Sequence, residues 1–413
     1  MTSAPGLQRR LGTADAVFIG LGSMIGAGVF AAFTPAAQAA GSGLLVGLVV
    51  AALVAVCNAL ASAQLAAAYP TSGGTYVYGR EQLGPWWGFL AGWSFVIGKT
   101  ASCAAMALTF ASYAAPPGWE RPVAVAAVIV LAAVNYRGIT RTAQLTRIIV
   151  VVVLVALAVA VSATLTADLP GVADLDLVAS GPYGILQSAG LLFFAFAGYA
   201  RIATMGEEVR NPARTIPRAI VIALSITIVV YAVVGIVLLG ALGANGLAAS
   251  SAPLLDASTA AGWPWIAPVV TVGAALASLG ALLALFAGIG RTSLAMAREG
   301  DLPRWLSAVH PRFHVPHRAE IVLAGVVIAL VVTIDLRGAI GFSSFGVLLY
   351  YFVANLSAFT QHREKRLVAR AVFVIGAIGC LVLVATLPRP SIGGGLVVLA
   401  IGVVFRLFFR ARG

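Results

Sequence analysis

The residues with the most informative types and spacing are three glycines near the N-terminus. They lie at positions 22, 26 and 28, in the run Gly22-Ser23-Met24-Ile25-Gly26-Ala27-Gly28-Val29-Phe30. Glycine is a poor helix former, so this run predicts an unwound segment, with the main-chain amides of Ala27, Gly28 and Val29 at the start of a second half-helix. A helix N-terminus carries partial positive charge and favours an anion such as a carboxylate. Close packing of two helices through small residues is an alternative of about equal weight.

A second run of this kind lies between residues 193 and 201, with the sequence Phe193-Phe194-Ala195-Phe196-Ala197-Gly198-Tyr199-Ala200-Arg201. It predicts another helix break, at the glycine, and the carbonyls freed there can hold an ammonium group. Interrupted helices at corresponding positions of two halves indicate a binding site near the middle of a membrane. The aromatic residues have a simpler interpretation as core packing, which we expect for Phe193.

Residues suited to enzyme chemistry are scarce. All 14 acidic residues can be assigned to loops or to the ends of apolar segments, and no histidine lies inside such a segment. Acid–base or metal catalysis therefore lacks its usual groups, and we expect neither an enzyme nor a cofactor. His310, His314 and His317 form a solvated loop more readily than a metal site. The three cysteines lie in apolar segments and are expected to be buried structural thiols: Cys57, Cys103 and Cys380.

The composition requires a membrane. Of the 413 residues, 61% are hydrophobic and 10% are charged, whereas a soluble domain has about 25% charged residues. A spanning helix needs about 20 apolar residues. On that basis the sequence predicts an all-α integral membrane protein with twelve spans, near residues 16–40, 43–67, 84–113, 121–136, 148–167, 184–206, 217–242, 264–296, 319–335, 339–360, 368–387 and 391–408.

The basic residues predict the orientation, because cytoplasmic loops are rich in Lys and Arg. With the N-terminus inside, 21 of the 26 basic residues fall on cytoplasmic termini and loops. Only Arg121, Arg337 and Arg389 fall outside, and the remaining two, Lys99 and Arg201, lie within spans. We therefore expect a multi-pass protein of the cell membrane with both termini cytoplasmic. The net charge of +12 is then topological and does not indicate nucleic acid. The stretch after Arg9 and Arg10 is too long for a cleavable signal.

Four motifs in order resemble one transporter group. They are the glycine run 22–30, the loop Pro70-Thr71-Ser72-Gly73-Gly74-Thr75-Tyr76-Val77-Tyr78, the stretch from Gly198 to Pro212, and the segment Arg291-Thr292-Ser293-Leu294-Ala295-Met296-Ala297-Arg298-Glu299-Gly300-Asp301-Leu302-Pro303. Together they are similar to the amino acid–polyamine–organocation (APC) superfamily, and within it to prokaryotic relatives of the cationic amino acid transporters.

This resemblance implies a five-plus-five inverted repeat (LeuT-like) with discontinuous helices 1 and 6. The core would cover residues 1–390, with repeats at about 16–167 and 184–360. Residues 361–413 would add two C-terminal helices, with no separate soluble domain. The implied function is secondary active transport of an amino acid. Its carboxylate would meet the amides of Ala27 and Gly28, and its ammonium the carbonyls of Ile25, Phe194, Ala195 and Ala197.

The sequence departs from the family where an ion would couple transport. Many relatives have a lysine in the fifth helix, but this chain has Val152 or Val153 there, and the eighth helix offers one hydroxyl, at Ser278. A proton or exchange is therefore expected rather than sodium. Lys99 lies near the middle of the third span, where an ammonium is costly and can exchange its proton. Lys99 is therefore the candidate for coupling proton movement to transport. The alternative is that its ammonium simply donates hydrogen bonds to carbonyls freed in an interrupted helix.

Four residues are candidates for gating. Arg201 is an intramembrane cation expected at the inner vestibule, Phe196 lies in the second break, and Glu207 and Glu208 are expected to pair with Arg9 or Arg10. Because no carboxylate can be placed in the pocket, we expect a neutral or weakly polar substrate rather than a cationic one. A carrier of polyamines or other organic amines, or a non-transporting scaffold or sensor, is the alternative; the identity of the amino acid and the oligomeric state stay open.

Overall fold

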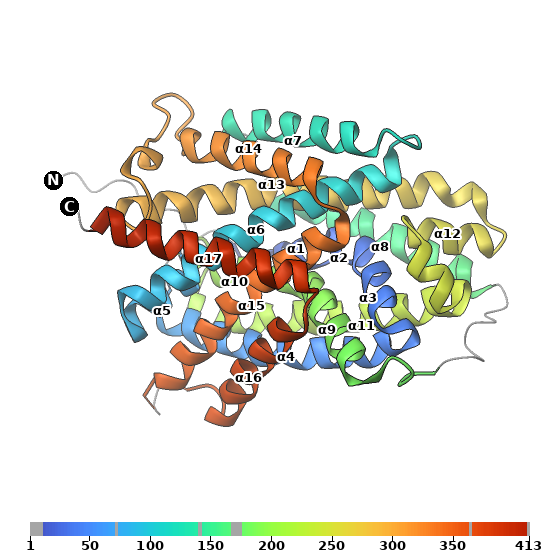
Figure 1. Cartoon of the computed structure of the whole chain (residues 1–413), viewed down its shortest axis with the longest axis horizontal. Coiled ribbons are helices and arrows are strands. Elements are labelled where there is room, and N and C mark those ends of the chain that lie inside the picture. The colour runs from blue at the N-terminus through green and yellow to red at the C-terminus, as the bar shows by residue number, and fades with distance from the viewer. Residues whose placement is uncertain (1–10, 71–72, 139–142, 167–175, 363–365, 411–413) are drawn as a thin grey trace.

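The computed structural model describes residues 11–70, 73–138, 143–166, 176–362 and 366–410, and every regular element in these ranges is a helix. The longer helices lie lengthwise in an elongated bundle (Figure 1). The first half contains α1 (Thr13–Met24), α2 (Ala27–Ala31), α3 (Phe33–Ala40), α4 (Leu44–Ala68), α5 (Thr75–Leu83), α6 (Pro85–Ala114), α7 (Glu120–Tyr136) and α8 (Ala143–Leu165). The second contains α9 (Gly181–Phe196), α10 (Ala200–Ala203), α11 (Pro212–Ala249), α12 (Pro253–Ala260), α13 (Ala267–Arg298), α14 (His317–Thr333), α15 (Leu336–Thr360), α16 (Arg370–Thr386) and α17 (Arg389–Arg410).

Each of the twelve expected spans coincides with one of these helices or with a broken series of them. Nine helical segments of the described ranges are long and apolar enough to cross a membrane, and the chain is a multi-pass membrane protein. Three helices at expected spans, α7, α14 and α16, have 17 residues each and are shorter than those nine. The count of twelve and the inverted repeat stay predictions.

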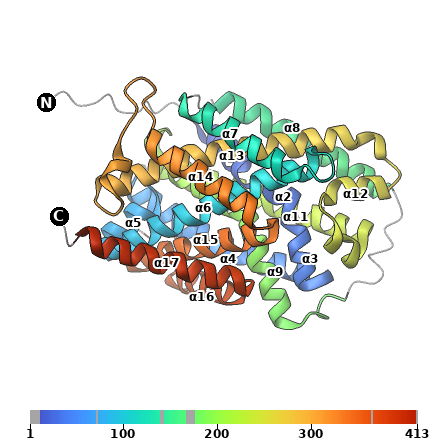
Figure 2. The ribbon, with the colours of Figure 1, turned by 45° about the horizontal axis from the view of Figure 1, so that its top comes forward.

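Two groups of helices meet at the centre of the bundle. In one group, α1 packs on α11, and α4 packs on both α9 and α11. In the other, α6 packs against α13 and α15, and α7 packs against α14. The turned view in Figure 2 shows α7 and α14 side by side, and α16 and α17 together on the opposite flank. The broken helices therefore lie between continuous helices that can hold them.

Two connections between the expected spans contain short helices. The expected end of a span at residue 242 coincides with a break in helical geometry at Gly243, where φ is +63° and only glycine is unstrained. Beyond it the chain is again helical to Ala249 and forms α12, in the stretch between the expected spans 217–242 and 264–296. The expected loop before the third span likewise holds α5.

The C-terminal helix is anchored by a buried ion pair. Arg406 of α17 and Asp301 have fully buried side chains, with 3.0 Å between Nη2 and Oδ1. The guanidinium group also donates to the carbonyl of Pro85 at 2.9 Å and lies 4.3 Å from the ring centre of Trp86. The other carboxylate oxygen of Asp301, Oδ2, accepts a hydrogen bond from the Tyr76 hydroxyl at 3.0 Å. These contacts join α17, α5 and the start of α6 to the connection after α13.

We predict that Arg406→Ala lowers the apparent melting temperature of the purified protein, because the buried carboxylate of Asp301 then keeps only the more distant and partly exposed Arg80, at 3.5 Å, as a cationic partner. Breaking a buried pair costs about 3–5 kcal/mol. Arg304→Ala is the matched control, since Arg304 is exposed in the same connection. Equal melting temperatures for Arg406→Ala and the control would show that the pair does not anchor α17.

Candidate functional site

The first helix break lies inside the glycine run, as expected. The amide of Ile25 donates to the carbonyl of Leu21 at 2.6 Å and ends α1. Gly26 then leaves helical geometry, with φ of −92° and ψ of −135°, and α2 begins at Ala27. Because the first N–H groups of a helix have no partner within it, the start of α2 presents unpaired main-chain donors.

The second break is a tightening of the helix rather than a gap. The α-helical pattern of α9 ends at Phe196, residues Ala197–Tyr199 form a 3₁₀ turn, and α10 continues from Ala200. A short 3₁₀ segment inside a helix leaves carbonyls without their usual partner and often marks a functional hinge. Both predicted discontinuities are therefore present in the structure.

The two breaks pack directly on each other through glycine. A Cβ atom added to Gly198 would lie 2.3 Å from the main-chain carbon and oxygen of Ser23, and one added to Gly28 would lie 2.6 Å from the Cβ of Ala195. Real Cβ contacts are not this short, so neither position accepts a side chain without a shift of the backbone. The packing role that the sequence offered as an alternative is thus present at the same positions as the proposed binding role.

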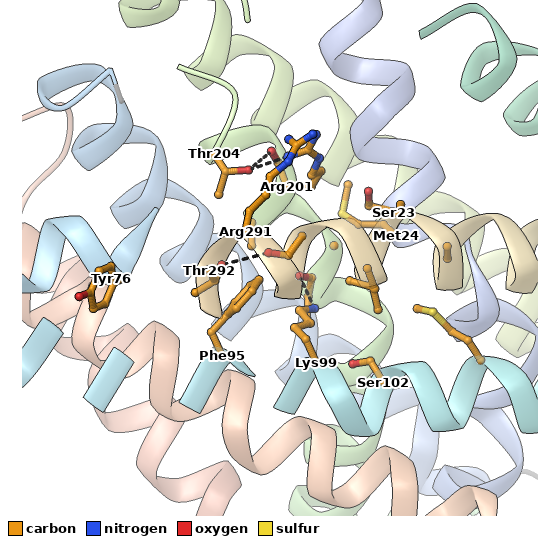
Figure 3. A pocket seen from close by; sticks show the side chains of 18 of the residues that line it. Ser23, Met24, Tyr76, Phe95, Lys99, Ser102, Arg201, Thr204, Arg291 and Thr292 are labelled. Atoms are coloured by element: carbon orange, nitrogen blue, oxygen red, sulfur yellow. Dashed lines mark hydrogen bonds between the residues drawn. The ribbon is translucent and has the colours of Figure 1, made fainter. Parts of the chain in front are cut away.

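A cavity of about 520 Å³ lies beside both breaks. The first break contributes Ser23, Met24, Ala27 and Gly28, and the second contributes residues from Phe194 to Arg201. One face of α6 forms the opposite wall, and Figure 3 shows Phe95, Lys99 and Ser102 pointing into it from that helix. The cavity reaches the surface at Arg291 and Arg298, which are exposed side chains of α13.

Side chains from two other helices satisfy the carbonyls of the second break. The carbonyl of Ala197 accepts hydrogen bonds from Lys99 Nζ and from the Tyr351 hydroxyl, both at 3.2 Å. A carbonyl oxygen has two lone pairs, so both are used. Lys99 is 7% exposed, and no carboxylate of the described residues lies within ion-pair distance of it.

Tyr231 connects the first break to the second. Its buried hydroxyl donates to the carbonyl of Met24 at 2.5 Å and lies 3.1 Å from the carbonyl of Ala195. The ring also packs against Phe196, with 5.0 Å between ring centres. We did not single out this residue from the sequence; a phenol within an otherwise apolar stretch of α11 is the signal that points to it.

The open end of the cavity carries guanidinium groups. Arg201 Nη2 lies 3.7 Å from Glu208 Oε1 and also donates through Nη1 to the Thr204 hydroxyl at 3.2 Å. Arg291 shares the same carboxylate at 4.0 Å, and Figure 3 shows the two arginines on the same side of the cavity. The partner of Arg201 is thus Glu208. The expected contacts with Arg9 and Arg10 lie outside the described residues.

The structure brings most of the predicted site residues to one cavity. Ala27, Gly28, Phe194, Ala195, Ala197, Lys99, Arg201 and Glu208 line it. Ile25 and Phe196 are buried beside the breaks but do not line it, and Glu207 lies outside the lining as well. No group of three or more His, Cys, Asp or Glu side chains suited to a metal occurs among the described residues.

The broken helices around a cavity agree with a comparison against known families. The amino acid permease family model matches residues 11–406. The chain belongs to the amino acid permease family. The resemblance to the APC superfamily is thereby confirmed, and this permease is a transporter rather than an enzyme.

The names of its relatives do not agree on a solute. The permease is 60% identical to an uncharacterized transporter of Mycobacterium tuberculosis, over 96% of this chain and 90% of that one. It is 28% identical to the methylthioribose transporter of Bacillus subtilis, over 98% and 94%. It is 29% identical to the human cationic amino acid transporter 4, over 86% of this chain and 60% of that protein. Family membership alone therefore does not name the solute.

We predict that Gly198→Ala impairs both folding and transport of this permease, because the new methyl group would overlap the main chain of Ser23. Overpacking of this kind costs about 1–3 kcal/mol. Gly288→Ala is the matched control, since Gly288 also lines the cavity but a Cβ there meets nothing within 4 Å. Thermal unfolding and transport of both variants are the measurements. Wild-type behaviour of Gly198→Ala would mean that the breaks do not require this close approach.

Tyr231→Phe tests the hydroxyl that joins the two breaks. It leaves the ring in place but removes the donor to Met24, so a buried carbonyl loses its partner at a cost of about 1–3 kcal/mol. We expect a lower melting temperature and slower transport, whereas Tyr183→Phe, at a 53% exposed tyrosine, should change neither. If the two variants unfold at the same temperature, the hydroxyl does not stabilise the breaks.

Proposed function

We propose that this permease carries an amino acid across the cell membrane by alternating access, with the solute held between the two helix breaks. The observation that carries the proposal is the 520 Å³ cavity into which both breaks present main-chain groups. Half-helix ends at the middle of a membrane bind the charged groups of a solute in carriers with broken helices. The amides of Ala27 and Gly28 are the proposed carboxylate donors, as expected from the sequence.

The proposed ammonium site is narrower than the sequence expectation. The carbonyl of Ala197 is already saturated by Lys99 and Tyr351, and that of Ala195 lies beside the Tyr231 hydroxyl. The carbonyl of Phe194 likewise accepts one hydrogen bond, from the amide of Ala197. Because a carbonyl oxygen has two lone pairs, and because Phe194 and Ala195 both line the cavity, these two carbonyls are the acceptors that we favour. The substrate ammonium can also take the place of Lys99 on Ala197 if Lys99 moves.

Contacts beyond the residues that line the cavity support an alternating mechanism. Toward the C-terminal end of α6, the Tyr113 hydroxyl donates to the carbonyl of Phe30 at 3.0 Å, and the two rings pack edge to face. The amide of Leu254 in α12 donates to the same hydroxyl at 3.4 Å. We propose that these contacts form the closed gate of the carrier. We propose that the open end, with its exposed arginines, faces the cytoplasm.

We propose proton coupling or exchange rather than sodium coupling. The position expected for a fifth-helix lysine is Val152 or Val153, and Val153 is buried without a polar group to offer. In the eighth span Ser278 supplies a single buried hydroxyl and Gly280 supplies none. Lys99, whose ammonium touches the second break, is the proposed proton carrier.

Uptake into proteoliposomes tests the function. Purified permease should accumulate a labelled amino acid when an inward proton gradient is imposed without sodium, or exchange it when the vesicles are preloaded. Lys99→Met should abolish accumulation against the substrate gradient. A monodisperse, cooperatively melting protein that moves no amino acid would refute the proposed function. Accumulation that ignores the gradient, or that survives Lys99→Met, would refute the coupling role alone.

A further inference from the structure

The walls of the cavity carry a surplus of positive charge. Four basic side chains line it, Lys99, Arg201, Arg291 and Arg298, against the single carboxylate of Glu208. That carboxylate lies between Arg201 and Arg291. The lining therefore carries three uncompensated positive charges, and the deepest of the four cations, Lys99, has no acidic partner among the described residues.

Lys99 is the one buried cation among these four side chains. It lies at the middle of α6 and is 7% exposed, and its ammonium donates one of its three N–H groups to the carbonyl of Ala197. A buried cation that lacks a counter-charge is costly, and such groups inside membranes usually serve function. An anionic group of a bound solute would supply the missing counter-charge.

The neighbouring groups favour the same ligand chemistry. Ser102 lies one turn from Lys99 on the cavity face of α6; its hydroxyl donates to the carbonyl of Gly98 at 3.2 Å and lies 2.6 Å from the Ser343 hydroxyl, so it is already paired within the protein and adds no negative charge to the cavity. The carbonyls that would attract a cation are in part occupied, at Ala197 by Lys99 and Tyr351 and at Ala195 by Tyr231. The cavity thus offers charged donors in excess and few free acceptors.

We propose that the solute of this carrier is an acidic amino acid, and that Lys99 determines this specificity by pairing with the side-chain carboxylate. The inference rests on the proposed function, since it assigns the charge of the amino acid that the cavity takes. It departs from the sequence expectation of a neutral or weakly polar substrate, which took no account of how the basic side chains gather around the cavity. Amino acids with cationic side chains and polyamines are repelled by the same four side chains. If Lys99 carries the coupled proton, proton and anion bind together.

Glutamate and glutamine make a matched pair of probes, because they have nearly the same shape and differ in side-chain charge. We expect the purified full-length permease to bind glutamate at least about tenfold more tightly than glutamine, and L-lysine not detectably, as measured by ligand-induced thermal shifts and by competition with labelled uptake. Stronger binding of glutamine or lysine than of glutamate would overturn the inference.

The Lys99→Met variant tests whether Lys99 determines the preference for glutamate over glutamine or only stabilises the fold. Removing one partner of a buried charge pair should weaken glutamate binding about thirtyfold or more, while glutamine binding stays within about twofold. Lys99→Arg, which keeps the charge, should retain a preference for glutamate. Equal losses for both ligands in Lys99→Met would indicate a merely structural lysine and overturn the specificity role. If Lys99→Met does not fold, the ratio in the wild-type protein decides.

Different results would refute amino acid transport and the acidic substrate. Uptake of neutral amino acids without uptake of glutamate or aspartate would overturn the acidic substrate and leave amino acid transport standing. Absence of uptake and binding for every amino acid tested, in a folded protein, would refute both.

Discussion

Main-chain N–H and C=O groups cannot be left unpaired in a lipid bilayer, and the helix breaks of this protein create such groups at its centre. The arrangement of the site depends on which side chains form hydrogen bonds with these main-chain groups. The carbonyl of Met24 is held by a hydroxyl from α11, and the carbonyl of Ala197 by an ammonium from α6 and a hydroxyl from α15. Three long helices, α6, α11 and α15, thereby contact the two interrupted ones, and the cavity lies beside the breaks.

Close packing and solute binding are not competing explanations of the glycines. Gly28 and Gly198 let the two breaks touch without intervening side chains, and this contact places the main-chain groups of both beside one cavity. A bulky residue at Gly28 would overlap Ala195, so loss of binding in such a variant would report packing as well as recognition. Cavity-lining glycines with open space, such as Gly288, separate the two effects.

Two buried cations in the protein show two different uses of charge. Arg406 pairs with Asp301 and lies over two aromatic rings, so its charge helps to join α17 to the rest of the bundle. Lys99 has a carbonyl as its hydrogen-bond partner and faces a cavity instead of a carboxylate. The dipole of a carbonyl compensates an ammonium only in part. We therefore propose that Lys99 can release its proton or pair with an anion, whereas Arg406 has a structural role.

The sequence by itself determined the membrane environment, the positions of the long apolar helices and the two breaks, because these depend on local properties: long apolar runs, glycine spacing and the distribution of charge along the chain. It did not predict the short helices α5 and α12. It also singled out Lys99 and Arg201, since a charge inside an apolar run is visible without a structure. Tertiary structure alone decided which partners they have. Tyr231 and Tyr351 are distant in the chain from the carbonyls they meet, and Glu208 is shared with Arg291 from another helix. Such pairings depend on how helices are rotated and packed against each other, which no local pattern of residues specifies.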